Sequence, residues 1–182
     1  MNHEPFLMAV ASDRLNRWLA LVAGLAVGLM MLVGAVDIVL TNIDVLGLDS
    51  RPVPSASEII ATLMVIAVFL GVPLAQQRRG HIQVELFTQR LPVPLRRACA
   101  VLASLLTAAM FAGVAWFGWK TVAHSWTVSE FAAGHFNLPM WPSRFALALG
   151  ASVMVLQCLL DLLGELVPAL RPQQAEAFPL FD

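Results

Sequence analysis

Four long apolar runs decide what this chain can fold into. Each is long enough to cross about 30 Å of hydrocarbon, which takes roughly 20 helical residues. In lipid the backbone amides must find their partners within the same segment, so helices are expected. The sequence therefore predicts an all-α membrane protein in which residues 1–182 form a single domain. Its four transmembrane helices are expected at about residues 18–40, 57–76, 98–120 and 144–166.

The composition agrees with a bilayer environment. Of the 182 residues, 59% are hydrophobic and 13% are charged, whereas charged residues make up about 25% of a typical soluble domain. So few polar side chains cannot cover a water-soluble globule. The chain has neither an acidic nor a basic tail, so no nucleic-acid partner is expected.

The basic residues predict the orientation. If the N-terminus is cytoplasmic, three of the eleven lysines and arginines lie outside, namely Arg51, Lys120 and Arg144. The other eight then lie inside: Arg14, Arg17, Arg78, Arg79, Arg90, Arg96, Arg97 and Arg171. Basic residues accumulate on the cytoplasmic side of membrane proteins. Both termini are therefore predicted to be cytoplasmic.

Acidic residues beside a span are candidates for a specific role, because a charge at the bilayer centre costs roughly 2.5–3.5 kcal/mol or more. Asp37 lies near the outer end of the first run, and Glu58 opens the second run on the same side. For Glu58 the main interpretation is interfacial placement at a helix N-terminus, where an acid complements the dipole. For Asp37, interfacial placement and a hydrogen bond to another helix or subunit both stay open.

The sequence offers no convincing catalytic, cofactor or metal site. The histidines His3, His81, His124 and His135 all lie outside the four runs, whereas a haem-binding anchor subunit needs axial ligands within its helices. Neither a Ser-His-Asp triad nor a metal-ligand cluster has suitable spacing. Asp37 is too near one end of its helix to bind a solute at the midplane. We therefore expect no enzyme activity and no cofactor in this chain.

The most strongly charged segment joins the second and third runs. Residues 76–97, QQRRGHIQVELFTQRLPVPLRR, contain five arginines. Gly80 can end the preceding helix, and a short helix after it would have two apolar faces: Val84, Phe87 and Leu91 on one, Ile82 and Leu86 on the other. A helix that only lies on lipid needs one such face, so a short amphipathic helix held between bilayer and protein is predicted. Docking combined with lipid anchoring, and anchoring alone, both stay open.

Two motifs give the chain a family resemblance. The loop has the pattern R-x-x-H-I-x-V-acid followed by L-P-x-x-x-R, formed by Arg78, His81, Ile82, Val84, Glu85, Leu91, Pro92 and Arg96. An L-P-x-W-P segment, formed by Leu138, Pro139, Trp141 and Pro142, precedes the fourth run. Together with Glu58, these motifs resemble the small membrane subunit (DctQ-like, or Q subunit) of tripartite ATP-independent periplasmic (TRAP) transporters. The resemblance covers about residues 15–168.

This resemblance implies a non-catalytic scaffold subunit of a sodium-coupled, binding-protein-dependent importer in the bacterial inner membrane. The solute would be an organic acid or a similar small molecule. The implied partners are a large polytopic membrane subunit (M), which would carry the sodium and substrate sites, and a periplasmic substrate-binding protein (P).

The candidate contact residues follow from the motifs and the charges. The partner-contact candidates are Asp37, Glu58, Arg78, Arg79, His81, Ile82, Val84, Glu85, Phe87, Leu138, Pro139 and Trp141. Phospholipid is a further expected partner, and the lipid-headgroup candidates are Arg90, Arg96 and Arg97. Two other functions stay open: a membrane-anchor subunit of a redox enzyme, which a haem absorbance band would favour, and a small autonomous exporter.

Overall fold

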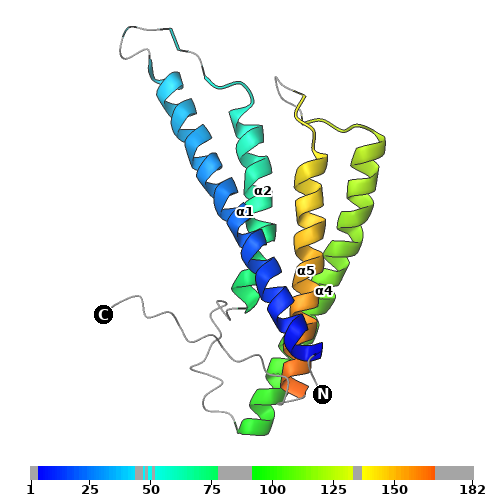
Figure 1. The fold of residues 1–182 in the computed structure, drawn as a ribbon. Helices are drawn as coiled ribbons and strands as arrows, with labels where there is room; N and C mark the ends of the chain where they lie inside the picture. Colours follow the sequence, from blue (N-terminus) through cyan, green and yellow to red (C-terminus); the bar gives the residue numbers. More distant parts are fainter. Residues whose placement is uncertain are drawn as a thin grey trace, which may run out of the picture.

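The structure, a computed structural model, describes residues 4–43, 47, 49–50, 52–77, 92–132 and 137–166, with only the backbone for residues 4–11, 93, 96–97 and 164–166. Its helices are α1 (Glu4–Thr41), α2 (Ala56–Gln77), α4 (Val93–Thr127) and α5 (Trp141–Leu166), as Figure 1 shows. All four are long and apolar enough to cross a membrane. The only strand-like pairing in the described ranges is an isolated bridge between Phe131 and Pro139. The predicted all-α fold with four long apolar helices is confirmed.

Two of the helices are longer than the apolar runs. Helix α1 begins at Glu4 rather than near residue 18, and α4 extends from Val93 to Thr127 rather than from 98 to 120. The polar residues beside these runs include no glycine, and their prolines fall only in first turns, where proline is tolerated. The helices therefore continue past the apolar part, and residues 121–127 of the expected outer connection are helical.

Proline and a left-handed residue set the limits of α4. Pro92 precedes the helix, and Pro94 lies in its first turn, where the missing N–H would have no intrahelical partner. At the other end Ser129 has a φ of 48°, and the Glu130 N–H donates to the Ser125 carbonyl at 3.1 Å. This is the bond of a Schellman-type cap, which ends the helix and redirects the chain towards α5.

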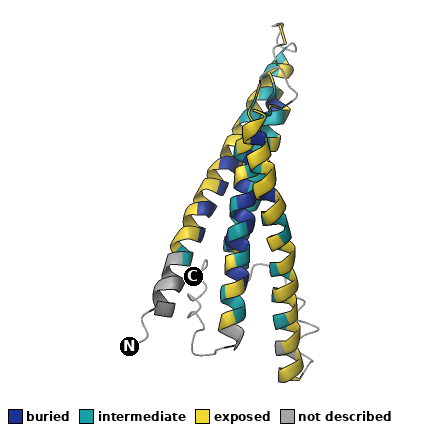
Figure 2. Ribbon diagram, turned by 90° about the vertical axis from the view of Figure 1, so that its right-hand side faces the viewer, coloured by how far each residue is buried: buried dark blue, intermediate teal, exposed yellow. Residues whose placement is uncertain are grey.

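The four helices form an open row rather than a closed bundle. Helix α2 packs against α1 and α5, and α4 packs against α5. The described helices have no large α1–α4 contact that would close the row. Figure 2 shows α1 and α4 diverging on opposite sides of the central helices. We call the end at which α2 and α5 begin the outer end and the opposite end the inner end, following the predicted orientation.

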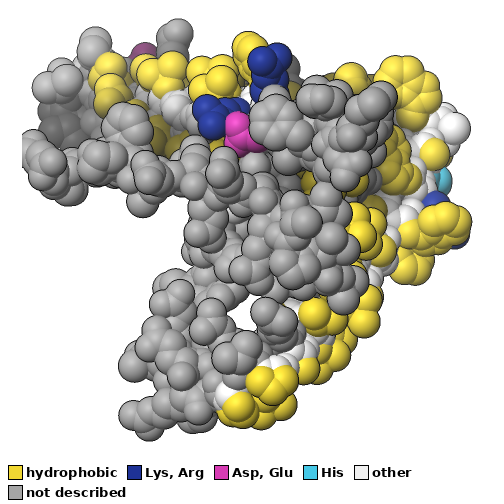
Figure 3. All heavy atoms as spheres, turned by 60° about the horizontal axis from the view of Figure 1, so that its bottom comes forward, with side chains coloured by type: hydrophobic (Ala, Val, Ile, Leu, Met, Phe, Trp, Pro, Cys, Tyr) yellow, Lys and Arg dark blue, Asp and Glu magenta, His cyan; other side chains and the backbone are white. Residues whose placement is uncertain are grey.

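Helix α5 is the centre of the packing. Buried residues make up 39% of its most apolar stretch, but only 17%, 11% and 11% in α1, α2 and α4. The buried cluster between α1, α2 and α5 consists of Leu19, Ala23, Leu70, Ala146 and Val153. Most other large apolar side chains face outward. Figure 3, seen towards the inner end, shows groups of hydrophobic side chains on the surface of the described helices.

Glycines on α4 and α5 allow the closest helix contacts. A Cβ on Gly118 would lie 3.1 Å from Leu147 and 3.2 Å from Ala148, and one on Gly150 would collide with the backbone of Phe69. By contrast, no atom lies within 4 Å of a Cβ built on Gly24 or Gly28. Gly24 and Gly28 therefore do not bring α1 into close contact with another described helix.

Candidate functional site

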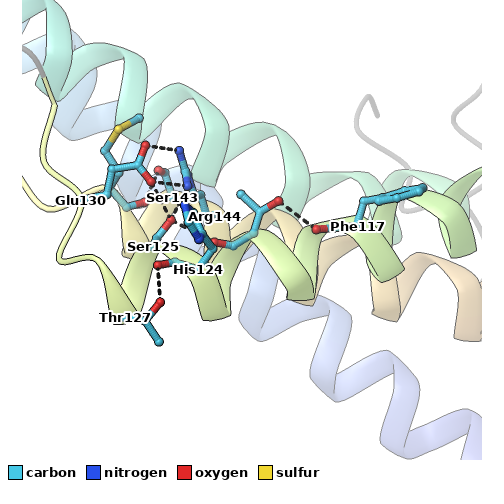
Figure 4. Close-up of polar contacts among 9 residues, drawn as sticks. Phe117, His124, Ser125, Thr127, Glu130, Ser143 and Arg144 are labelled. Atoms are coloured by element: carbon cyan, nitrogen blue, oxygen red, sulfur yellow. Dashed lines mark hydrogen bonds and ion pairs between the residues drawn. The ribbon is translucent and has the colours of Figure 1, made fainter.

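An ion pair joins the beginning of α5 to the segment that follows α4. Arg144 lies in the first turn of α5, and Glu130 follows the C-terminal cap of α4. Two parallel hydrogen bonds connect them, from Nη1 to Oε2 at 2.5 Å and from Nη2 to Oε1 at 2.6 Å (Figure 4). The exposed fractions of the two side chains are only 22% and 32%. A bidentate pair of this kind fixes geometry better than a single charged contact.

The Ser125 hydroxyl completes this cluster. Its side chain is fully buried in the last turns of α4. The hydroxyl accepts a hydrogen bond from Arg144 and lies 2.9 Å from the Thr121 carbonyl and 3.2 Å from Glu130 Oε2, either of which can accept its proton. The three side chains bind the end of α4, the connection and the beginning of α5 together. We call Ser125, Glu130 and Arg144 the outer cluster.

Residues of the L-P-x-W-P motif lie beside the outer cluster. The Ala132 N–H donates to the Leu138 carbonyl at 2.8 Å, next to the bridge between Phe131 and Pro139. Trp141 begins α5 and meets Trp126 of α4 edge to face, with ring centroids 5.4 Å apart. Trp126 and Phe131 are exposed. The motif therefore builds a short, well-connected hairpin with aromatic side chains on its surface.

The two acidic candidates, Asp37 and Glu58, also lie at the outer end. Asp37 Oδ1 accepts a hydrogen bond from the Val53 N–H at 2.8 Å, so it ties α1 to the α1–α2 connection. This bond lies within the chain and involves a loop backbone rather than another helix. Glu58 lies in the first turn of α2 and accepts a hydrogen bond from the Ser57 hydroxyl at 3.0 Å. Their roles in partner contact stay predictions.

A network of side-chain amides connects three helices at the inner end. Asn16 of α1 donates to Gln77 of α2 at 2.9 Å and to Gln157 of α5 at 3.0 Å. Asn16 and Gln157 are buried. Both donors of the Asn16 amide are thus used, while its Oδ1 atom is buried without a partner in the described part of the chain. We call Asn16, Gln77 and Gln157 the inner amide network.

Carboxylates extend this network towards the helix ends. Gln77 donates to Asp13 at 3.3 Å, and Asp13 pairs with Arg17 at 2.9 Å on the surface of α1. Asp161 accepts hydrogen bonds from Gln76 at 3.2 Å and from Gln157 at 3.3 Å. The inner ends of α1, α2 and α5 are therefore held together by polar contacts, immediately before the arginine-rich segment begins.

Most candidates in the arginine-rich segment lie outside the described residues. This applies to Arg78, Arg79, His81, Ile82, Val84, Glu85, Phe87 and Arg90, and to the short amphipathic helix predicted there. Arg96 and Arg97 lie on the first turn of α4, where the structure describes the backbone. Their contacts with a partner or with lipid stay predictions.

Both polar clusters include residues that the sequence analysis overlooked. Arg144 was counted only as an outer charge, and Glu130 was not considered, although it is the only acid between the third and fourth runs. Asn16 and Gln157 are uncharged, so a search for ionisable residues passes over them. A search for amides within or beside the apolar runs would have found both. Among the described residues, no three His, Cys, Asp or Glu side chains come together as metal ligands.

Comparison with known families gives one match. Residues 37–167, which are 131 of the 182, match the family model described as "Tripartite ATP-independent periplasmic transporters, DctQ component". No curated protein matches the chain. The matched range contains α2, α4 and α5 entirely but only the last five residues of α1. The outer cluster lies within it, whereas Asn16 lies before it.

Proposed function

This chain belongs to the DctQ family and is thus a small membrane subunit of a tripartite ATP-independent periplasmic transporter, and we propose that it acts as a fixed, non-catalytic scaffold. The transporter would be a sodium-coupled, binding-protein-dependent importer of an organic acid or a similar small solute. In this proposal a large membrane subunit carries the sodium and substrate sites, and a periplasmic protein delivers the solute. Both termini of the scaffold lie on the cytoplasmic side of the inner membrane.

The open helix row is the observation that carries this proposal. Helices α1 and α4 each pack on one side only. Their other sides expose large apolar residues, among them Leu25, Met31 and Ile38 on α1 and Leu102, Leu105 and Leu106 on α4. Such flanks suit contact with lipid and with the apolar helices of a larger membrane protein, where association depends on close packing. A scaffold that enlarges another subunit needs surfaces of this kind.

The distribution of charge supports the absence of a transport site. Asp37, Glu58, Glu130, Arg144 and Asp161 all lie towards one helix end or the other. Solute and ion sites of secondary transporters lie near the bilayer midplane, where broken helices and embedded charges form them. All four helices here are continuous over their described length. The polar contacts instead tie helices together at the two ends, as a rigid support requires.

Co-purification tests the scaffold role. The tagged chain, extracted from its native membrane in mild detergent, should bring down a much larger polytopic subunit. In liposomes, solute uptake should need this complex, the periplasmic binding protein and an inward sodium gradient. A lone chain that is stable and transports solute by itself would contradict the proposal. A haem absorbance band in the purified protein would instead indicate a redox anchor subunit.

A further inference from the structure

A groove of about 500 Å³ lies between α4 and α5 in the outer half of the molecule. Its wall on α4 includes Met110, Gly113, Phe117 and Thr121, and its wall on α5 includes Leu147, with Arg144 at the outer end. The Thr121 hydroxyl donates to the Phe117 carbonyl at 2.9 Å, so this donor already has an acceptor within α4. Apart from Arg144, the groove therefore presents an apolar surface.

Two glycines shape the groove. Gly118 allows α4 to approach α5 closely, because a side chain there would press on Leu147 and Ala148. Gly113, more than one turn earlier, has no atom within 4 Å of its missing Cβ position. The first glycine brings the two helices together, and the second leaves the space beside them empty. The groove is thus a consequence of where side chains are absent.

The length of the groove matches one leaflet of a bilayer. Met110 and Thr121 are eleven residues apart, which corresponds to about 16 Å along a helix. Half of the hydrocarbon core of a typical bilayer is about 15 Å thick. Both residues lie within the apolar part of α4, Ala98–Thr127. The groove therefore runs from the outer interface to about the midplane, as an acyl chain of the outer leaflet does.

The outer end of the groove can accept a phosphate. The outer cluster uses three of the five N–H donors of Arg144, which leaves two for another acceptor. Lys120 precedes Thr121 in α4 and so lies at the same level of the membrane, with its Nζ atom 5.1 Å from the Trp116 ring centroid and outside the residues that line the groove. The formal charges of Lys120, Arg144 and Glu130 sum to +1, which favours an anion at this level of the membrane.

From these features we infer that the groove binds one phospholipid of the outer leaflet. An acyl chain lies along α4 from Thr121 to Met110, and the phosphate meets Arg144 at the outer end of the groove. The groove is about as long as one acyl chain of the outer leaflet and has a guanidinium at its outer end, so it matches one lipid tail together with its headgroup. This inference depends on membrane insertion and not on the transport role.

Lipid retention with matched glycine variants tests the inference. The full chain, alone or with whatever subunit co-purifies, is taken from vesicles of phosphatidylethanolamine and phosphatidylglycerol, and the retained lipid is counted by native mass spectrometry. Gly113→Leu fills the groove and should lose one tightly bound phospholipid per chain. Gly24→Leu, at an equally open position on α1, should retain it. Equal retention by both variants would overturn the inference.

A second measurement needs no variant and remains informative if Gly113→Leu misfolds. A phospholipid with a photoreactive group in its acyl chain is incorporated into the vesicles, and adducts on the unmodified chain are mapped by mass spectrometry. Adducts should concentrate at residues 110–121 and at Leu147. Adducts spread evenly over the exposed flanks of α1 and α4 would overturn the inference. If the large subunit fails to co-purify but the adducts concentrate there, only the proposed function fails.

Discussion

The Phe69 carbonyl of α2 faces the Cα atom of Gly150 on α5, so closely that any side chain at residue 150 would collide with it. Pro73, four residues after Phe69, is fully buried in α2. Proline has no N–H, so it cannot donate the hydrogen bond that this carbonyl would otherwise accept. An unpaired carbonyl facing lipid costs several kcal/mol. Packing against α5 covers this carbonyl, and the absence of a side chain at Gly150 allows the two backbones to approach each other there.

We expect Gly150→Ala to destabilise the helix row strongly. The added methyl group has no space, so α2 and α5 must separate, and overpacking of this kind costs about 1–3 kcal/mol. The melting temperature in detergent, followed by circular dichroism, should fall clearly. Gly24→Ala is the matched control, because its Cβ meets no atom within 4 Å. If both variants have the same melting temperature, the close α2–α5 contact does not stabilise the protein.

The outer cluster should behave as a coupled unit. Glu130→Gln or Arg144→Gln leaves a half-buried charge without its partner, and hydrogen bonds to charged groups contribute about 1.5–3 kcal/mol each. The double variant should lose less stability than the sum of the two single variants. Because both side chains remain partly exposed, the coupling energy should decrease at high salt. Strict additivity in chemical unfolding would show that the pair does not hold α4 to α5.

The number, order and approximate positions of the helices could be predicted because bilayer thickness sets the length of an apolar run. The placement of Asp37, Glu58 and Trp141 at one and the same end of the helix row followed from their positions at or near the ends of those runs. Hydropathy did not predict where α1 and α4 begin and end. A helix stops at a cap such as Ser129, not where its residues become polar.

Contacts between residues far apart in the chain could not be predicted from the sequence, for a different reason. Asn16 and Gln157 are separated by 141 positions, and nothing in a neutral amide indicates its partner. The Arg144–Glu130 pair depends on the hairpin that brings residues 130 and 140 together. The Phe69–Gly150 contact depends on how two helices cross, which is set by side-chain shape over both surfaces. Each of these contacts is specified by tertiary packing and not by a local pattern.

We expect Asn16→Leu to weaken the inner end of the helix row. The change leaves the Oε1 atoms of Gln77 and Gln157 without their donor, and a buried unsatisfied polar group costs about 1–3 kcal/mol. Amide hydrogen exchange should accelerate in α1 near residue 16 and in α5 near residue 157. Arg14→Gln, an exposed change on the same helix, serves as the control. Unchanged protection in the Asn16 variant would show that the amides do not couple these helices.

Impermeant labelling tests the predicted orientation. In a background with Cys99→Ala and Cys158→Ala, Asn137→Cys should react with a membrane-impermeant maleimide in intact spheroplasts, because the α4–α5 connection is predicted to face the periplasm. Arg171→Cys should react only after permeabilisation. The eight-to-three distribution of basic residues is the physical reason. The reverse labelling pattern would invert the topology and reassign the outer cluster to the cytoplasmic side.

Variants of Arg79 and His81 can separate docking from lipid anchoring. If the segment docks to the large subunit, replacing both residues with glutamine should lower the yield of complex in a pull-down. Arg79→Lys should lower it too, because lysine keeps the charge but lacks the planar, bidentate guanidinium. If the segment only anchors to anionic lipid, each basic residue contributes about 1 kcal/mol through charge alone, and Arg79→Lys should match the unmodified chain. An unchanged yield for the double glutamine variant would contradict docking and leave anchoring as the role of these residues.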